Sequence, residues 1–256
     1  MIIRRLSFWR VIRGEILKTR RTRGLLLAIL GPLAVTGIVV ALYIDNAVKA
    51  DPDVSPWMGF SRQVFNFYFF LYPLFAALLG FMLSNIEHKN GGFKHIFTLP
   101  APKSYFYFSK VMILLGWLGL SLLCALAFLV IAGGALHAFI PDYAFAQNAL
   151  PTSVYVFLFR LFVSLISIVA IHFFLSLYFD NFIVAVGSAV FLLVFGMVAV
   201  NHESAWLIPY TYPLQHFMGF MAGDTTWVDQ RSWVSLGYGL VFFTAGYWLV
   251  SRKNIK

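Results

Sequence analysis

Residues 111–136 read VMILLGWLGLSLLCALAFLVIAGGAL, a stretch of 26 positions without one charged side chain. A transmembrane helix needs about 20 such residues, because about 30 Å of hydrocarbon is crossed at about 1.5 Å per residue. A transmembrane strand is about half as long and alternates in polarity. The stretch therefore predicts a helix that spans a membrane.

Five similar windows lie outward from this one, and only Arg160 and His172 interrupt them with charged or titratable groups. They cover residues 25–44, 64–86, 154–179, 182–200 and 235–250. We therefore expect an all-α integral membrane protein with six transmembrane helices, in which residues 1–256 form a single membrane domain led by residues 1–24. The composition agrees, since only 11% of the residues are charged against about 25% in soluble domains. A soluble enzyme, a disordered chain and a disulfide scaffold are excluded.

The basic residues predict the orientation. Of the 19 lysines and arginines, eight precede the first window, four lie between the second and third windows, and three follow the sixth. Lys and Arg accumulate on the cytoplasmic side, so we expect both termini to be cytoplasmic. This asymmetry accounts for the net charge of +9 without nucleic acid as a partner. A cleaved signal peptide is the alternative for residues 25–44, but the long basic lead and the lack of a small-x-small cleavage site argue against it.

The N-terminal lead is predicted to form a helix along the membrane surface. Leu6, Trp9, Ile12 and Ile16 recur at spacings of three and four, which gives an apolar stripe. Basic residues beside it can meet anionic lipid head groups. The alternative is a basic tether without a helix.

A second feature follows the second window, at residues 87–103, EHKNGGFKHIFTLPAPK. Phe93, Ile96 and Phe97 are spaced to share one face of a short helix, which Pro100 and Pro102 would end. Such a helix could press into a partner's groove. The alternative is an ordinary solvated loop.

With Glu15-Ile-Leu-Lys18 in the lead, Lys89-Asn-Gly-Gly-Phe-Lys94 and Thr98-Leu-Pro100 in the loop, and Ser109-Lys110 after it, the chain resembles the permease subunits of type-2 ABC exporters. It is most similar to the permeases of lantibiotic-protection and bacitracin-resistance systems. The resemblance covers the whole chain in span number, loop lengths and orientation.

This resemblance implies roles for both features. The lead would be an elbow helix, with Glu15, Lys18, Arg20 and Arg21. The loop would be a coupling helix that docks on a separate ATPase subunit, which would bind the ATP and magnesium. Residues 201–231 would be a re-entrant segment, or else a folded outer loop. The implied coupling residues are Glu87, Lys89, Asn90, Gly91, Gly92, Phe93, Lys94, His95, Phe97, Thr98, Leu99 and Pro100.

The resemblance also implies an assembly and a task. Two permease subunits, identical or not, would join two ATPase subunits in the inner (cytoplasmic) membrane of a bacterium. They would export an antimicrobial peptide or another amphipathic substrate. The chain itself has no G-x-x-x-x-G-K-[ST] sequence, so hydrolysis would come from the partner.

Arg160 and His172 are the candidate residues of a substrate pathway. Twelve positions separate them, about 18 Å along one helix, so they cannot act on one atom. We expect Arg160 to extend toward the head groups and His172 to pack with a hydrogen bond. Asp224 and Asp229 are expected to be solvated loop acids, and no metal site is predicted.

Two alternatives to a permease remain open at this point. An intramembrane enzyme acting on lipid or peptide would use His172. A secondary transporter would place more ionisable groups near the middle of the membrane. The aromatic residues of the second window could line a route for an amphipathic substrate, although lipid-facing Phe is the commoner explanation.

Overall fold

The computed structural model describes residues 7–19, 23–45, 54–88, 101–140, 145, 148–179 and 181–252, with the backbone alone at 87 and 88. Within these ranges the chain is helical and has no strand. The helices are α1 (Phe8–Thr19), α2 (Gly24–Ile44), α3 (Pro56–His88), α5 (Lys103–Phe139), α6 (Thr152–Tyr178), α7 (Phe182–Ala199), α8 (Tyr212–Met221) and α9 (Gln230–Arg252), with short 3-10 turns η4 (Ala205–Leu207) and η5 (Pro209–Thr211).

Six of the described helices, α2, α3, α5, α6, α7 and α9, are long and apolar enough to cross a membrane. Each overlaps one predicted window, so the prediction of six spans is confirmed. The windows for α3 and α5 began too late, at residues 64 and 111, because they left out the charged residues Arg62 and Lys110. Helix α5 begins at Lys103 instead, since the Lys110 ammonium is buried against a carboxylate and does not interrupt the helix.

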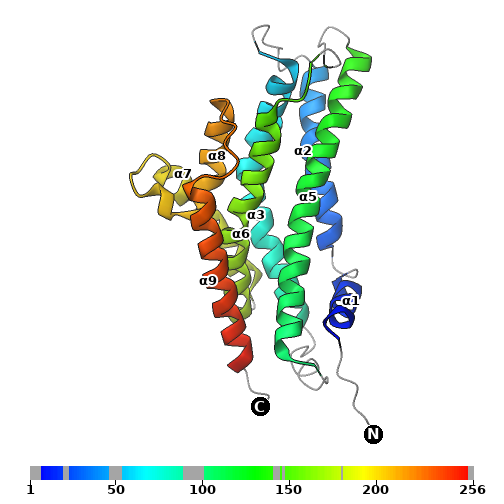
Figure 1. Ribbon diagram of the computed structural model, residues 1–256. Coiled ribbons are helices and arrows are strands. Elements are labelled where there is room, and N and C mark those ends of the chain that lie inside the picture. Colours follow the sequence, from blue (N-terminus) through cyan, green and yellow to red (C-terminus); the bar gives the residue numbers. More distant parts are fainter. Residues whose placement is uncertain are drawn as a thin grey trace.

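Helix α6 lies at the centre of the bundle and packs against α3, α8 and α9. Helices α2 and α5 pair along most of their length and form the other side of the molecule (Figure 1). Phe65 of α3 stacks on Phe157 of α6 with ring centroids 4.3 Å apart. The exposed side chains of the outer helices are largely apolar, for example Phe191 and Val198 of α7, as lipid contact requires.

Helix α1 lies across one end of the bundle rather than along it (Figure 1). We call this end, where α5 starts and α9 finishes, the α1 end. The predicted helix in the lead is confirmed, but its apolar stripe is divided. Ile12 is buried against the bundle, whereas Trp9 is 67% and Ile16 42% exposed. Leu6 lies outside the described residues.

The segment between α7 and α9 is folded, and its central part, residues 209–220, is largely buried. Tyr210, Tyr212 and Phe220 are each at most 3% exposed, and the segment packs against α3, α6 and α7. At Gly196 of α7, an added Cβ would lie 2.7 Å from the backbone carbonyl of Tyr210, so only glycine allows this approach. Such packing agrees equally with a re-entrant segment and with a folded outer loop at residues 201–231.

Candidate functional site

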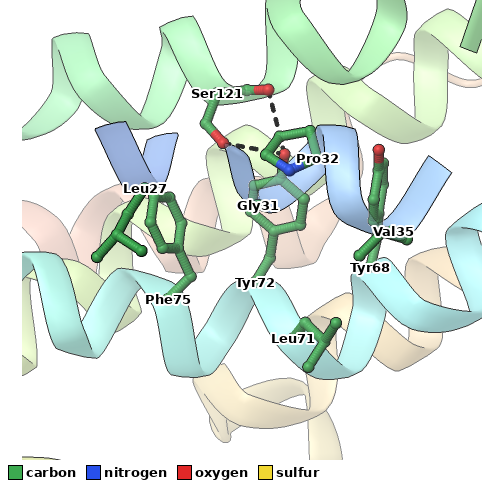
Figure 2. A pocket seen from close by; sticks show the side chains of 9 residues that line it. All are labelled: Leu27, Gly31, Pro32, Val35, Tyr68, Leu71, Tyr72, Phe75 and Ser121. Carbon is green, nitrogen blue, oxygen red and sulfur yellow. Dashed lines mark hydrogen bonds between the residues drawn. The ribbon is translucent and has the colours of Figure 1, made fainter. Parts of the chain in front are cut away.

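A groove between α2, α3 and α5 opens among aromatic side chains (Figure 2). Helix α3 contributes Tyr68, Leu71, Tyr72 and Phe75, and Ser121 lies on α5. The facing part of α2 is small or apolar: Leu27, Gly31, Pro32 and Val35. The cavity volume of about 60 Å³ would hold a few water molecules but no peptide. A substrate of that size requires the helices to separate.

The tyrosine hydroxyls of the groove are fixed by hydrogen bonds. Tyr72 donates to the Ser121 carbonyl oxygen at 3.2 Å, and its hydroxyl is also 3.2 Å from the Ser121 Oγ (Figure 2). The Tyr68 hydroxyl lies 3.5 Å from the Thr36 Oγ1 on α2. These contacts give an apolar wall a few polar groups, a combination suited to amphipathic ligands.

Both helices that face each other across the groove contain an interior proline. Pro32 lies in α2 and Pro73 in α3. A proline has no N–H to donate to the carbonyl four residues earlier, which weakens the helix at that turn. The affected carbonyls belong to Ala28 and Phe69. The two helices are therefore most easily bent beside the groove.

A second cluster lies at the α1 end, around a buried ion pair. The Lys110 ammonium of α5 is 2.7 Å from the Glu15 carboxylate of α1, and the two side chains are 7% and 1% exposed. Lys18 binds the other carboxylate oxygen at 2.7 Å. Burial raises the pKa of Glu15, but the two ammonium groups outweigh this, and the pKa is lowered. Glu15 is therefore ionised at neutral pH.

Apolar and polar contacts extend this attachment. Val11 of α1 packs on Phe106 of α5, with Ala101 and Tyr105 beside them. Lys103 donates to the Ser251 carbonyl of α9 at 3.1 Å. The first two turns of α5 are thus bound to both α1 and α9.

The predicted coupling residues precede these turns. Residues 89–100, and with them every predicted coupling residue except Glu87, lie outside the described residues, as do Arg20 and Arg21. Glu87 lies in the last turn of α3. The coupling helix stays a prediction.

The expectation that Arg160 extends toward the head groups is wrong. Its side chain is 4% exposed, and its guanidinium donates to Asp224 at 2.8 Å. The pair joins α6 to the segment before α9, and Asp224 remains a solvated loop acid, with its side chain 38% exposed. Hydrogen bonds from Thr226 and Arg160 lower the pKa of Asp224 to about 2.

Asp229, by contrast, is not a solvated acid, since its side chain is only 16% exposed. It accepts hydrogen bonds from the Ser232 backbone and hydroxyl at 2.9 Å and 2.7 Å and pairs with Arg231 at 3.0 Å. The His216 ring lies 3.8 Å away. The Ser232 contacts cap the start of α9, and the His216 contact holds it against α8.

His172 forms a hydrogen bond with the Tyr210 hydroxyl, and its side chain is fully buried. The expectation of a hydrogen-bonded packing residue is confirmed. Neither His172 nor Arg160 lines the groove of Figure 2, so the structure does not bring the two predicted pathway residues together at this cavity. Both instead hold α6 to the segment between α7 and α9.

Six described helices that are long and apolar enough to cross a membrane, with α6 at their centre, indicate a multi-pass membrane protein. A family model described as ABC-2 family transporter protein matches residues 11–196, well over half of the chain. The chain belongs to this family, whose members are membrane components of transporters that associate with an ABC ATPase. No curated protein and no solved structure was found to match it.

Two features of these sites were missed in the sequence. The sequence did not predict the ion pair between Glu15 and Lys110. The available signal was that Glu15 is the single acidic residue in positions 1–44 and lies one turn from Ile12, on the buried face of α1. The α2 side of the groove was also not predicted. The available signal was Gly31-Pro32, which interrupts an otherwise bulky apolar window.

Proposed function

We propose that the chain is the transmembrane subunit of an ATP-driven exporter. It forms the substrate pathway for an antimicrobial peptide or another amphipathic molecule and is driven by a separate ATPase subunit. Two permease subunits, identical or different, would complete the pathway, with both termini in the cytoplasm of a bacterium. Family membership supports transport, and the Glu15–Lys110 ion pair carries the proposal of coupling.

The ion pair supports coupling because of its position. Residues 89–100 connect α3 to α5, and α5 begins three residues after them. A force applied to that connection by an ATPase reaches the first turns of α5, where Glu15, Val11 and Ser251 hold α1 and α9. Buried contacts transmit rigid-body motion, since packed helices move as units between discrete arrangements. Helix α1 would then act as the elbow helix.

The groove supports an amphipathic substrate. Tyr68, Tyr72 and Phe75 offer aromatic faces with two fixed hydroxyls. Bending of α2 at Pro32 and of α3 at Pro73 would widen this groove in one state and close it in the other. ATP hydrolysis would bias the two states, and alternating access would follow.

The coupling proposal is tested with the chain co-expressed with the ABC ATPase encoded beside its gene. We expect the two to co-purify and bacitracin or a lantibiotic, used as probes, to stimulate ATP hydrolysis in liposomes. Phe93→Asp and Gly92→Pro should abolish that stimulation while membrane insertion and basal hydrolysis are retained. An ATPase that does not co-purify, or full stimulation in both variants, would show that the loop does not couple.

A further inference from the structure

A second cavity lies at the α1 end, between α1, the first turn of α2 and the third and fourth turns of α5. Its volume is about 420 Å³, within the range of about 300–1,000 Å³ typical of small-molecule sites. The walls are apolar. They include Ile12 and Ile16 from α1, Leu25 from α2, and Met112, Gly116 and Trp117 from α5.

The cavity is open on its outer side. Ile16 is 42%, Leu25 38% and Met112 48% exposed, and these three side chains come from three different helices. An apolar groove of this kind needs a cover, because exposed apolar surface in water is unfavourable. It lies between a helix that does not span and the starts of two that do, which is the level where head groups meet acyl chains.

Exposed basic residues lie next to the lining residues in the sequence. Arg13 of α1 follows Ile12 directly, and Arg23 lies two residues before Leu25. The one acidic residue in this part of the chain, Glu15, is buried and already matched by Lys110 and Lys18. An apolar groove with exposed arginines beside it is complementary to a molecule with an acyl chain and an anionic head.

We propose that this groove binds one anionic phospholipid of the surrounding bilayer. An acyl chain occupies the space between Ile16, Met112 and Gly116, and the phosphate head group meets Arg13 and Arg23 beside it. The site would anchor α1 through a lipid as well as through its ion pair, and it is independent of what the protein transports.

Charge also distinguishes this occupant from a second copy of the chain. Two copies meeting at this face would place the same arginines opposite each other, and like charges at close range repel. The cytoplasmic leaflet has the opposite charge and attracts basic residues that lie near it.

The occupant is tested by native mass spectrometry of the full chain in mild detergent. Phosphatidylglycerol and phosphatidylcholine with identical dioleoyl chains serve as probes. We expect one phosphatidylglycerol to bind at least about ten-fold more tightly than phosphatidylcholine. Arg13→Gln/Arg23→Gln should remove this preference, since it leaves the apolar walls unchanged. Equal binding of the two lipids by the unmodified chain would overturn the proposal.

The location is tested by filling the groove. Gly116 is exposed, and a Cβ added there meets no atom within 4 Å, so Gly116→Leu should fold and weaken phosphatidylglycerol binding at least about ten-fold. Gly134→Leu is the matched control, because Gly134 is equally open and lies five full turns further on the same face of α5. Unchanged binding in Gly116→Leu would overturn the site, and a dimer lost in that variant with lipid binding retained would assign the groove to a second copy.

A spectroscopic measurement covers the case in which Gly116→Leu fails to fold. Phosphatidylglycerol with brominated acyl chains should quench the fluorescence of Trp117, which lines the groove. The quenched signal should fall in Trp117→Phe by more than in Trp248→Phe, a tryptophan in the last two turns of α9 that does not line the groove. Equal losses in the two variants would contradict binding at this groove.

Discussion

Replacing Glu15 by Gln should destabilise the protein by about 3 kcal/mol. Breaking a buried ion pair costs about 3–5 kcal/mol, because the remaining charge is left without compensation in a medium that solvates it poorly. Lys110 would be that charge, with a side chain 7% exposed. The lower end of the range applies, since the Gln amide oxygen can still accept a hydrogen bond from the ammonium.

The second half of the pair responds differently. Lys110→Met leaves Glu15 with Lys18 at 2.7 Å, so we expect a smaller loss of about 2 kcal/mol. The double variant Glu15→Gln/Lys110→Met removes both charges and should recover to within about 1 kcal/mol of the unmodified protein, because an uncharged pair of similar volume avoids the cost of burying two charges. Arg10→Gln, an exposed base on the same helix, is the control and should change stability by less than about 0.5 kcal/mol.

The assay is thermal unfolding in detergent, followed by the loss of monodisperse protein. For a chain of this size, about 1 kcal/mol corresponds to about 2–4 °C, so Glu15→Gln should lower Tm by about 6–12 °C. A double variant whose loss equals the sum of the two single losses would refute the reasoning, because independent sites add and coupled charges do not.

The same pair gives a pH dependence. Burial raises the pKa of Glu15, but Lys110 and Lys18 lower it below its ordinary 4.5 overall. A carboxylate with a lowered pKa contributes its full stability above the unfolded value, and this is lost as the pH falls through the folded value. The unmodified protein should therefore lose stability below about pH 4.5, and this component should be missing in Glu15→Gln. Identical acid profiles would contradict the assignment.

Two further predictions concern helix packing. Gly31→Leu places a side chain in the groove, and Gly37→Leu, six residues along α2 and equally open, does not. We expect the first to lower peptide-stimulated ATP hydrolysis at least about five-fold and the second to leave it unchanged, and equal rates would remove the groove from the pathway. Gly196→Ala should destabilise by about 1–3 kcal/mol through overlap with Tyr210, whereas Gly187→Ala, which meets no atom within 4 Å, should be neutral or stabilising; similar melting temperatures would refute the close approach.

Much of the fold was readable from the sequence because lipid makes strong demands on composition. A spanning segment must be long, apolar and internally hydrogen-bonded, and all six windows met these conditions. The errors at α3 and α5 have one cause. Their windows began only after Arg62 and Lys110. The sequence does not show that a charged residue such as Lys110 is paired and can lie within a helix.

The candidate sites were less readable because each is assembled from distant positions. Arg160 and Asp224 are 64 residues apart, and Glu15 and Lys110 are 95 apart. A single sequence does not show which distant residues pair. Taken one at a time, the charged residues Arg160 and Asp224 were expected to contact head groups or water. The burial of Arg160 against Asp224 reversed that expectation for Arg160.

The sequence by itself determined that this is a membrane protein, how many spans it has and that its lead forms a helix. Each of these depends only on the residues of one segment and its neighbours. Only the tertiary structure decided which charges are paired, that Tyr68 and Tyr72 face Gly31 and Pro32 across a groove, and that α1 is bound to α5. The physical reason is that a helix can form from local hydrogen bonds alone. A groove or an ion pair exists only after separate helices have packed together.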